Sequence, residues 1–553
     1  MSTETRTVAE LAISCLEAEG VEYLFGIPGE ENIRLVDATA GSKIRFILVR
    51  HEQAASFMAD IYGRLTGKAG VCTATLGPGA INLLLGVADA QTDSTPLVAI
   101  SAQVGLNRIY KESHQIVDLV SMFRPVTKWA DMLLTPDAVP EMVRKAFDLA
   151  QQERPGATYI AIPEDVEAAT VPAEAKPLTA RPYHAAGPDE DKVAKAAALI
   201  RAAKRPVMLA GHGVARAGAS AALTRLAEQL NMPVATTFMA KGVISDRHPN
   251  ALGVIGFMRH DYENFAFDEA DLILSIGYEL QEFAPVRINP KHDKTILHVH
   301  RFAAETDAAY PVAVSIEADI PRAIAALSEA FRGGAVPASH PAPKIRALRD
   351  GELSAHEADD SFPLKPQRVI GDMRKALDDE DIVLADTGAI KMWMARLYPT
   401  YEPLTCLISN GLSTMAWTLP GALAAALARP GRKVLAAMGD GSFMMNSQEI
   451  ETALREKIPL KVLIWEDGSY GLIKWKMDME LGHHRDVDFN NPDFVKYAES
   501  FGAKGYRIGA AAELLPTLRK ALAEDGVSVI TCPVDYSENM KLTDRLGELT
   551  IAL

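Results

Sequence analysis

Cysteine is scarce in this chain of 553 residues, which contains only Cys15, Cys72, Cys406 and Cys532. No two of them form a Cys-x-x-Cys pair, so the sequence indicates neither a disulfide framework nor a zinc site. Long hydrophobic runs are also missing, and the first residues contain no apolar signal region. These features exclude a bilayer-spanning helix and predict a cytoplasmic protein.

Positive charge is in deficit, since 57 Lys and Arg residues face 72 Asp and Glu residues and the formal net charge is −15. Such a balance argues against nucleic acid or an anionic membrane surface as a partner. Hydrophobic residues make up 48% of the chain and charged residues 23%, as in ordinary globular proteins.

Short-period repeats and low-complexity segments are absent, but two stretches rich in Pro, Ala and charge, residues 168–191 and 333–366, look like linkers. The length also favours two or three domains. Each flanked segment alternates Val, Ile and Leu runs with Ala-rich helical patterns, which is typical of parallel sheets covered by helices. We therefore predict three doubly wound α/β domains at residues 1–175, 190–335 and 360–553.

The most informative segment spans residues 433–472, where two apolar runs each end near a carboxylate, Asp440 in Gly-Asp-Gly-Ser and Asp467 in Glu-Asp-Gly-Ser. Between them, Asn446 to Glu449 reads as a capping box that opens a helix. The segment predicts strand, helix and parallel strand with a right-handed crossover.

The crossover would bring Asp440 and Asp467 side by side, although they are 467 − 440 = 27 positions apart. Open parallel sheets bind ligands at this edge, and two carboxylates suit Mg²⁺ that shares its other oxygens with a phosphate. The alternative is that both aspartates merely begin turns. The pairing with an intervening helix favours the metal site.

In the first segment, residues 46–49 predict a buried strand that ends just before Glu52, and residues 53–66 predict a helix. By itself Glu52 would be a solvated strand end or a helix-dipole partner. In the middle segment, the spacing of Gly211, Gly213 and Gly218 does not satisfy the dinucleotide pattern Gly-x-Gly-x-x-Gly.

Residues 439–449, 467–471 and 49–55 together resemble the acetolactate synthase family of thiamine diphosphate-dependent enzymes, and the resemblance covers nearly the whole chain. It is greatest to the catabolic, FAD-independent type. The resemblance implies the three-domain decarboxylase and carboligase architecture. It also implies that Asp440, Asp467 and the carbonyl of Ser469 hold Mg²⁺ between the protein and the cofactor diphosphate.

The same resemblance implies catalytic roles. Glu52 would hydrogen-bond the aminopyrimidine ring and so activate the cofactor, Gln115 would orient the substrate, and Met415 would hold the cofactor bent. His114 is either a proton shuttle near neutral pH or a packed, hydrogen-bonded histidine. The implied cofactor contacts are Gly26, Glu52, Thr75, Asn82, Ala389, Ile390, Lys391, Ser413, Met415, Asp440, Gly441, Ser442, Asp467, Ser469, Tyr470, Gly471 and Leu472.

Several departures from the family pattern bear on specificity. Residues 277–283 lack the Arg-Phe-Asp-Asp run of flavin-binding relatives, so FAD is not expected. Lys391 stands where many relatives have histidine, and Lys476, or Trp475 if the match shifts by one, stands where the acceptor substrate is contacted. The alternative is that both lysines are simply exposed.

The resemblance implies an acetolactate synthase that decarboxylates pyruvate and condenses it with a second pyruvate, as a homodimer or homotetramer with active sites shared between subunits. A sister carboligase or decarboxylase acting on another 2-oxo acid remains an alternative. A non-catalytic, cofactor-binding paralogue is a second one, against which the presence of Glu52 argues.

Overall fold

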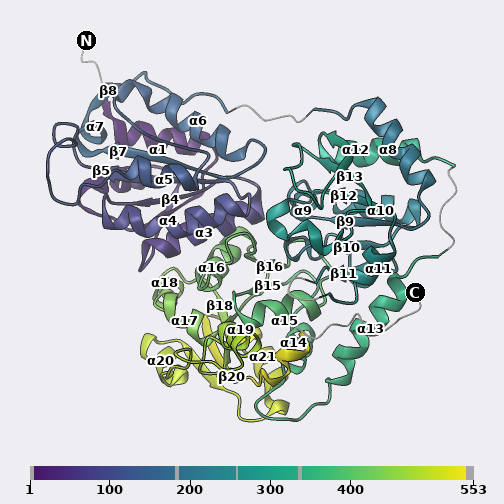
Figure 1. Ribbon diagram of the computed structural model, residues 1–553. Helices are drawn as coiled ribbons and strands as arrows, with labels where there is room; N and C mark the ends of the chain where they lie inside the picture. The colour runs from purple at the N-terminus through teal and green to yellow at the C-terminus, as the bar shows by residue number, and fades with distance from the viewer. Residues whose placement is uncertain (1–4, 181–185, 257–259, 334–338, 543–553) are drawn as a thin grey trace. The chain divides into compact units, whose positions relative to one another are not determined.

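Three six-stranded parallel sheets dominate the computed structural model, which describes residues 5–180, 186–256, 260–333 and 339–542. Figure 1 shows helices packed against the sheets. The prediction of three doubly wound α/β domains is therefore confirmed. Residues 543–553 of the predicted last domain, and parts of both predicted linkers, lie outside the described residues.

The first sheet has the order β3-β2-β4-β5-β7-β6. Helices α1 and α6 cover one face, and α3 and α4 cover the other (Figure 1). A short antiparallel pair, β1 with β8, joins the two ends of this domain. The elements are β1 Thr5–Thr7, α1 Val8–Ala18, β2 Tyr23–Gly26, α2 Ile33–Ala38, β3 Arg45–Leu48, α3 Glu52–Thr66, β4 Gly70–Ala74, α4 Pro78–Thr92, β5 Leu97–Gln103, α5 Leu119–Phe123, β6 Trp129–Met132, α6 Val139–Gln151, β7 Ala157–Pro163, α7 Glu164–Ala168 and β8 Thr170–Pro172.

Strand β3 corrects one prediction. It lies at the edge of the sheet, and Ile47 is its only fully buried residue, whereas Arg45 and Leu48 are exposed. The prediction of a buried strand was wrong because a short apolar run does not distinguish an edge strand from a central one. The predicted helix after it is confirmed as α3.

The middle sheet has the order β11-β10-β9-β12-β13-β14. Its elements are α8 Glu190–Ala202, β9 Pro206–Ala210, α9 His212–Arg216, α10 Ser220–Leu230, β10 Val234–Thr236, β11 Ala251–Val254, α11 Asn264–Glu269, β12 Leu272–Ile276, β13 Thr295–His300, β14 Val312–Glu317, α12 Ile320–Ala330 and α13 Ala342–Ala355. Helix α13 lies inside the second predicted linker, and its Ile345 is fully buried in a core with Tyr278 and Phe267. That stretch is therefore in part a packed helix.

The last sheet has the order β16-β15-β17-β18-β20-β19. Its elements are α14 Pro366–Ala376, β15 Ile382–Ala385, α15 Ala389–Leu397, β16 Cys406–Ile408, α16 Thr418–Ala428, β17 Val434–Gly439, α17 Asp440–Asn446, α18 Glu449–Arg455, β18 Leu460–Glu466, α19 Gly471–Leu481, α20 Phe494–Phe501, β19 Lys504–Arg507, α21 Ala511–Ala523 and β20 Val527–Pro533. The predicted parallel strands are confirmed as β17 and β18. Two short helices stand between them in place of the single one predicted.

The first and last sheets have the same topology. Numbered within each domain, the strands of both follow the order 2-1-3-4-6-5, whereas the middle sheet follows 3-2-1-4-5-6. In the first order the chain reverses its direction of travel across the sheet between the neighbouring strands 1 and 3. Ligands of doubly wound sheets bind at such a switch point, outside the carboxyl ends of the strands.

The chain forms two compact units. The first comprises Met1–Tyr183, Gly411–Gly431 and Asn446–Leu460, and the second comprises the remaining segments. Helices α16 and α18 thus belong to the first unit, although β17 and β18 belong to the second. The predicted domain boundaries remain a prediction.

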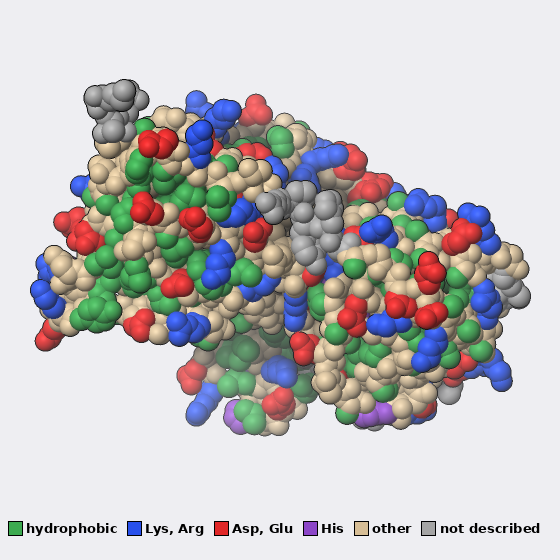
Figure 2. Space-filling view, turned by 90° about the horizontal axis from the view of Figure 1, so that it is seen from above, with side chains coloured by type: hydrophobic (Ala, Val, Ile, Leu, Met, Phe, Trp, Pro, Cys, Tyr) green, Lys and Arg blue, Asp and Glu red, His purple; other side chains and the backbone are tan. Residues whose placement is uncertain are grey.

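On the face drawn in Figure 2, acidic and basic side chains are interspersed, and neither forms a patch. Within the described parts of the chain, none of the helices has the length and apolar character needed to cross a membrane.

Candidate functional site

The switch point of the first sheet lies between β2 and β4. Gly26 is the last residue of β2, and Thr75 follows β4 directly. The Thr75 hydroxyl donates a hydrogen bond to Glu31 Oε2 at 2.5 Å. Two of the predicted cofactor contacts therefore lie at the edge where doubly wound sheets bind ligands.

Glu52 and Asn82 meet beside this switch point. Glu52 begins α3, Asn82 lies in the first turns of α4, and Asn82 Nδ2 donates to Glu52 Oε2 at 3.0 Å. Gly79 makes the close approach possible, since a Cβ there would lie 3.2 Å from Glu52 Oε1 and 2.9 Å from Thr75. The half-buried Glu52 carboxylate thus has one neutral donor and a second oxygen available to another.

The segment with His114 and Gln115 also approaches this turn. Gly77 has φ +51, and a Cβ there would lie 2.8 Å from the backbone oxygen of Gln115, which itself has φ +56. The side chains of His114 and Gln115 are exposed. His114 is therefore not packed into the core of this unit; the proton shuttle and the packed, hydrogen-bonded histidine both remain predictions.

Residues 411–417, which carry Ser413 and Met415, are bound to the far ends of α3 and α4. Asp93 Oδ1 accepts from Gly411 N at 2.5 Å, and Asp89 Oδ1 accepts from the Thr414 hydroxyl at 2.7 Å. The buried guanidinium of Arg64 pairs with Asp93 at 2.8 Å and with Asp60 at 3.3 Å. Burial raises the pKa of Asp89 to about 8, and the charges of Asp93 and Asp60 add to this effect.

The switch point of the last sheet lies between β15 and β17. Ala389, Ile390 and Lys391 open the helix after β15, and Asp440 opens the helix after β17. Asp467 follows β18, the neighbour of β17. The two carboxylates are thus brought to one sheet edge, as the sequence predicted.

Asp440 organises the turn that carries Asp467. Its Oδ2 accepts from Asp467 N at 3.1 Å and from Gly468 N at 2.8 Å, and its Oδ1 accepts from Gly441 N at 2.8 Å. Asn491 Nδ2 adds a fourth hydrogen bond, to Asp440 Oδ2, at 2.7 Å. Asn491 is not among the predicted site residues, because the sequence between β18 and α20 contains no motif that assigns it a role.

Asp467 is held next to a like charge. Burial raises its pKa to about 7, and the charge of Asp440 adds to the rise, while a hydrogen bond from the Ser469 hydroxyl at 3.0 Å opposes it. A divalent cation would relieve this repulsion. Within the described residues no cluster of three or more His, Cys, Asp and Glu side chains could hold a metal. The predicted set has only two such side chains, and its third ligand is a backbone carbonyl.

The surroundings of Asp440 fit a phosphate group. Ser442 is buried, and its hydroxyl, which can donate to a phosphate oxygen, has no hydrogen-bond partner in the described structure. Asn491 Oδ1 has no partner there either, but as an acceptor it suits a cation and not a phosphate. A Cβ at Gly441 would lie 3.0 Å from the Tyr470 ring and 3.2 Å from the Phe489 ring, so these rings pack directly against the backbone of Gly441. Tyr470 itself is exposed and precedes Gly471 and Leu472, the first residues of α19.

The two unusual lysines differ in environment. Lys391 is 2% exposed and its ammonium lies 5.9 Å from the centre of the Phe238 ring, so the expectation of an exposed lysine was wrong there. Lys476 is exposed and pairs with Glu480 at 3.6 Å, as expected of a surface lysine. Trp475, in contrast, is buried and lines a cavity of about 520 Å³ together with Asp467 and Ser469.

In the middle domain, the turn after β9 is occupied by a carboxylate of the chain itself. Glu282 accepts hydrogen bonds from His212 N, at 3.1 Å to both oxygens, and from Glu279 N at 3.0 Å. Burial raises the pKa of Glu282 to about 8, and the charge of Glu279 adds to it. In nucleotide-binding sheets this turn receives a phosphate instead.

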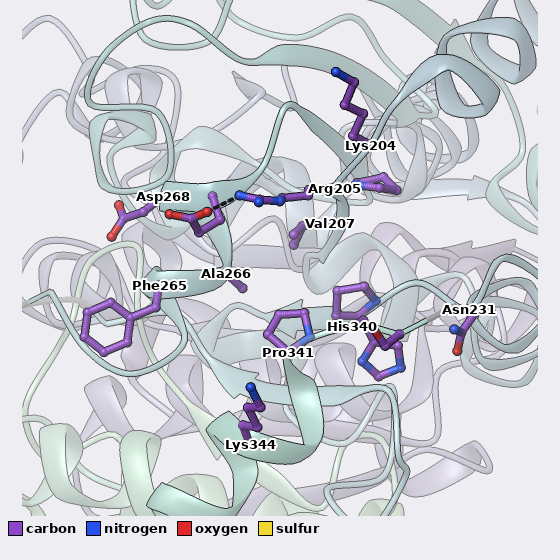
Figure 3. Close-up of a pocket in the computed structure, with 14 residues that line it drawn as sticks. Lys204, Arg205, Val207, Asn231, Phe265, Ala266, Asp268, His340, Pro341 and Lys344 are labelled. Atoms are coloured by element: carbon purple, nitrogen blue, oxygen red, sulfur yellow. Dashed lines mark hydrogen bonds and ion pairs between the residues drawn. The ribbon is translucent and has the colours of Figure 1, made fainter. Parts of the chain in front are cut away.

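A second cavity, of about 580 Å³, lies in the middle domain at the amino end of β9 (Figure 3). Lys204 and Arg205 line it on one side and Lys344 on another, and Arg205 pairs with Glu269. None of the predicted site residues lines it, and it lies at the end of the strand where doubly wound sheets do not bind their ligands.

The three-sheet fold agrees with the family matches. Residues 6–122 match "Thiamine pyrophosphate enzyme, N-terminal TPP binding domain", residues 193–327 match the central domain, and residues 386–532 match the C-terminal TPP binding domain of that family. The chain belongs to the thiamine pyrophosphate enzymes.

Within this class the chain is similar to acetolactate synthases over nearly its whole length. It is 35% identical to the acetolactate synthase of Bacillus subtilis, over 98% of this chain and 96% of that protein. It is 34% identical to the catabolic acetolactate synthase of Raoultella terrigena, over 97% of both chains. It is also 34% identical to the acetolactate synthase isozyme 1 large subunit of Escherichia coli, over 98% of this chain and 96% of that one.

Proposed function

We propose that this protein is an acetolactate synthase of the catabolic, FAD-independent type, which decarboxylates pyruvate and condenses it with a second pyruvate to 2-acetolactate. One observation carries the proposal. A carboxylate bonded to an asparagine, Glu52 with Asn82, lies at one switch point, and a carboxylate pair, Asp440 with Asp467, lies at the equivalent switch point of a sheet with the same strand order.

When bound, thiamine diphosphate supplies the electron sink for loss of CO₂ from a 2-oxo acid. In our proposal Asp440, Asp467 and the carbonyl of Ser469 hold Mg²⁺, and Ser442 donates to a diphosphate oxygen. Glu52 holds a proton at the aminopyrimidine, and Asn82 fixes its carboxylate from the other side. Gln115 orients the substrate, His114 moves a proton, and Met415 supports the cofactor from residues 411–417.

We further propose that the enzyme works without FAD. The Glu282 carboxylate takes the backbone donor of His212 that would otherwise be offered to a nucleotide phosphate. We propose a cytoplasmic location as well, in keeping with four cysteines that are all buried and unpaired.

We propose a homodimer or homotetramer in which active sites are shared between subunits. Exposed apolar side chains flank the site residues in both units and would be covered by a second copy. In the first unit these are Ile81 and Leu85, on either side of Asn82 on α4; in the second they are Met444, Met445, Tyr470 and Ile473, next to the metal motif.

Product analysis tests the proposed reaction. Apo-protein is supplied with Mg²⁺, thiamine diphosphate and pyruvate but no FAD, and products are identified by mass spectrometry and NMR. We expect 2-acetolactate. Acetaldehyde, or no consumption of pyruvate, would contradict the proposal.

A sister carboligase or decarboxylase that acts on another 2-oxo acid is the second candidate. The buried Lys391 favours it, because a cation next to Ile390 and Phe238 would suit a more anionic substrate than pyruvate. Consumption of a dicarboxylic 2-oxo acid in preference to pyruvate, abolished by Lys391→Met, would identify it. If no oxo acid is consumed while thiamine diphosphate still binds, the protein would be the non-catalytic, cofactor-binding paralogue.

A further inference from the structure

Glu449 is a fully buried carboxylate that none of the roles above uses. It is the first residue of α18, and the capping box predicted around it is not formed, because Gln448 is the N-cap and no side chain caps the helix. Its carboxylate instead points to the turn between β3 and α3 and accepts hydrogen bonds there. All of these residues belong to the first compact unit.

Three donors converge on this carboxylate. Arg50 N donates to Oε1 at 3.0 Å, His51 N donates to Oε1 at 3.1 Å, and the Thr452 hydroxyl donates to Oε2 at 2.6 Å. Arg50 and His51 are the two residues directly before Glu52, so the backbone that aims Glu52 has its amide groups fixed by Glu449. The side chain of His51 then caps α3 by accepting from Gln53 N at 3.1 Å.

The rest of α18 strengthens the same contact. Arg455 donates to the carbonyl oxygen of Leu48, the last residue of β3, and Glu456 pairs with Arg45 at 2.6 Å. Because β3 is an edge strand with a single fully buried residue, its own packing restrains the following turn weakly. Helix α18 supplies the missing restraint.

The chemistry of the contact requires a carboxylate. Arg50 N, His51 N and the Thr452 hydroxyl are all donors, and an ionised carboxylate accepts at both oxygens. A glutamine would instead turn an amide nitrogen toward one set of these donors. Burial raises the pKa of Glu449 to about 7, while the hydrogen bonds from Thr452, Arg50 and His51 oppose the rise. An unmatched donor in this buried place would displace the turn.

We propose that Glu449 is a positioning residue for Glu52: its carboxylate fixes the Arg50 and His51 amides and thereby the direction in which the catalytic carboxylate points. The proposal rests on the role given to Glu52 under the proposed function. It makes α18 a structural part of the cofactor-activating site.

The test compares Glu449→Gln with Glu141→Gln, which changes an exposed carboxylate on α6 of the same compact unit. In the apo-protein, amide hydrogen exchange of residues 50 and 51 is measured by mass spectrometry. We expect exchange on the order of tenfold faster in Glu449→Gln alone, because a local restraint is lost.

In the protein loaded with thiamine diphosphate and Mg²⁺, exchange of the cofactor C2 proton for deuterium is followed by NMR. A small misplacement of Glu52 should slow this exchange by a factor on the order of ten to a hundred in Glu449→Gln. kcat should fall with it while KM changes little. Glu141→Gln should match the wild type in all three measurements.

Thr452→Val provides a second variant should Glu449→Gln fold poorly, since it removes only the hydroxyl that orients Glu449. We expect faster amide exchange and slower C2 exchange in this variant as well, with smaller changes than in Glu449→Gln. If amide exchange and C2 exchange in both variants proceed at the rates of the wild type, the proposal is overturned. Glu52→Gln separates the two levels: if it leaves C2 exchange unchanged, the proposed function fails; if it abolishes C2 exchange while Glu449→Gln does not slow it, only the positioning role fails.

Discussion

At the scale of single residues, Glu52 and the pair of Asp440 and Asp467 are in opposite electrostatic situations. Glu52 is half-buried with one neutral partner, so it is available to a ligand. Asp440 and Asp467 repel each other unless a cation lies between them, and burial makes that repulsion stronger. The following two predictions separate these roles.

Glu52→Gln should lower kcat with pyruvate by a factor on the order of a thousand, because a neutral amide cannot exchange a proton with the aminopyrimidine. Thiamine diphosphate should still bind, since the amide keeps a hydrogen-bonding side chain at the site. Steady-state kinetics and calorimetric titration measure the two quantities. Glu30→Gln, an exposed neighbour of the same domain, is the control; unchanged turnover in Glu52→Gln would refute the mechanism.

Asp440→Asn should raise the Mg²⁺ concentration needed for cofactor binding at least about tenfold, since it removes one anionic ligand and turns an amide toward the donors of Asp467, Gly468 and Asn491. Asn491→Ala keeps the carboxylate and should have a smaller effect. Fluorescence titration of thiamine diphosphate at varied Mg²⁺ compares them. Equal Mg²⁺ requirements for Asp440→Asn and the wild type would rule out Asp440 as a ligand.

At the scale of elements, α3 and α4 serve two purposes with their two ends. Their amino ends carry Glu52 and Asn82. Toward their carboxyl ends lie three buried aspartates around Arg64, two of which, Asp89 and Asp93, bind residues 411–417. Three carboxylates share one guanidinium, so protonation of one of them lowers the electrostatic free energy of the cluster. Asp89, with its pKa raised to about 8, is that one.

Asp89 therefore makes stability depend on pH. Its pKa rises from 3.8 in the unfolded chain to about 8 in the folded one, so the folded state binds the extra proton and its stability falls as pH rises between these values. Asp89→Asn keeps an acceptor for Thr414 without a titrating group. Relative to the wild type, this variant should gain stability as pH rises from 5 to 8, by at most about 1.4 kcal/mol per pH unit.

Denaturant unfolding at several pH values measures this difference. Asp93→Asn is the matched comparison, since it removes a carboxylate that pairs with the buried Arg64 at 2.8 Å and should cost about 3–5 kcal/mol. A difference between Asp89→Asn and the wild type that does not change with pH would show that Asp89 is ionised in the folded protein.

At the scale of the whole molecule, the proposed assembly depends on apolar side chains that stay exposed in each unit. Leu85 on α4 is 39% exposed and lies one turn from Asn82. Leu85→Glu would place a charge in an interface between copies and should shift the protein toward monomers with lower activity. Leu134→Glu, at a position 59% exposed and away from α4, is the control. Sedimentation velocity measures the distribution, and a fully active wild-type monomer would contradict the shared site.

Local patterns in the sequence were sufficient for most of the fold. Alternating apolar runs and helical segments predicted parallel α/β domains, and the pair of motifs at Asp440 and Asp467 predicted strand, helix and strand. Such features depend on neighbours in the chain, where periodicity and turn chemistry act. The single helix predicted between β17 and β18 proved to be α17 and α18, because helix breaks have weak sequence signals.

Long-range contacts account for what was missed. The alternative of an exposed Lys391 failed, β3 proved to be an edge strand, and Glu449 does not cap its own helix. Each outcome depends on residues far away in the chain. Asn491 joined the site through a contact with Asp440 across 491 − 440 = 51 positions, which no local motif announces.

The sequence by itself determined the class of the domains, the placement of Asp440 and Asp467 at one sheet edge, and Glu52 at the start of a helix, because these follow from local periodicity and from motifs within one crossover. Only the tertiary structure decided that the first and last sheets share one strand order, that Glu52 meets Asn82, and that Glu449 fixes the turn before Glu52. Those facts depend on which surfaces pack together, and packing is a property of the folded chain as a whole.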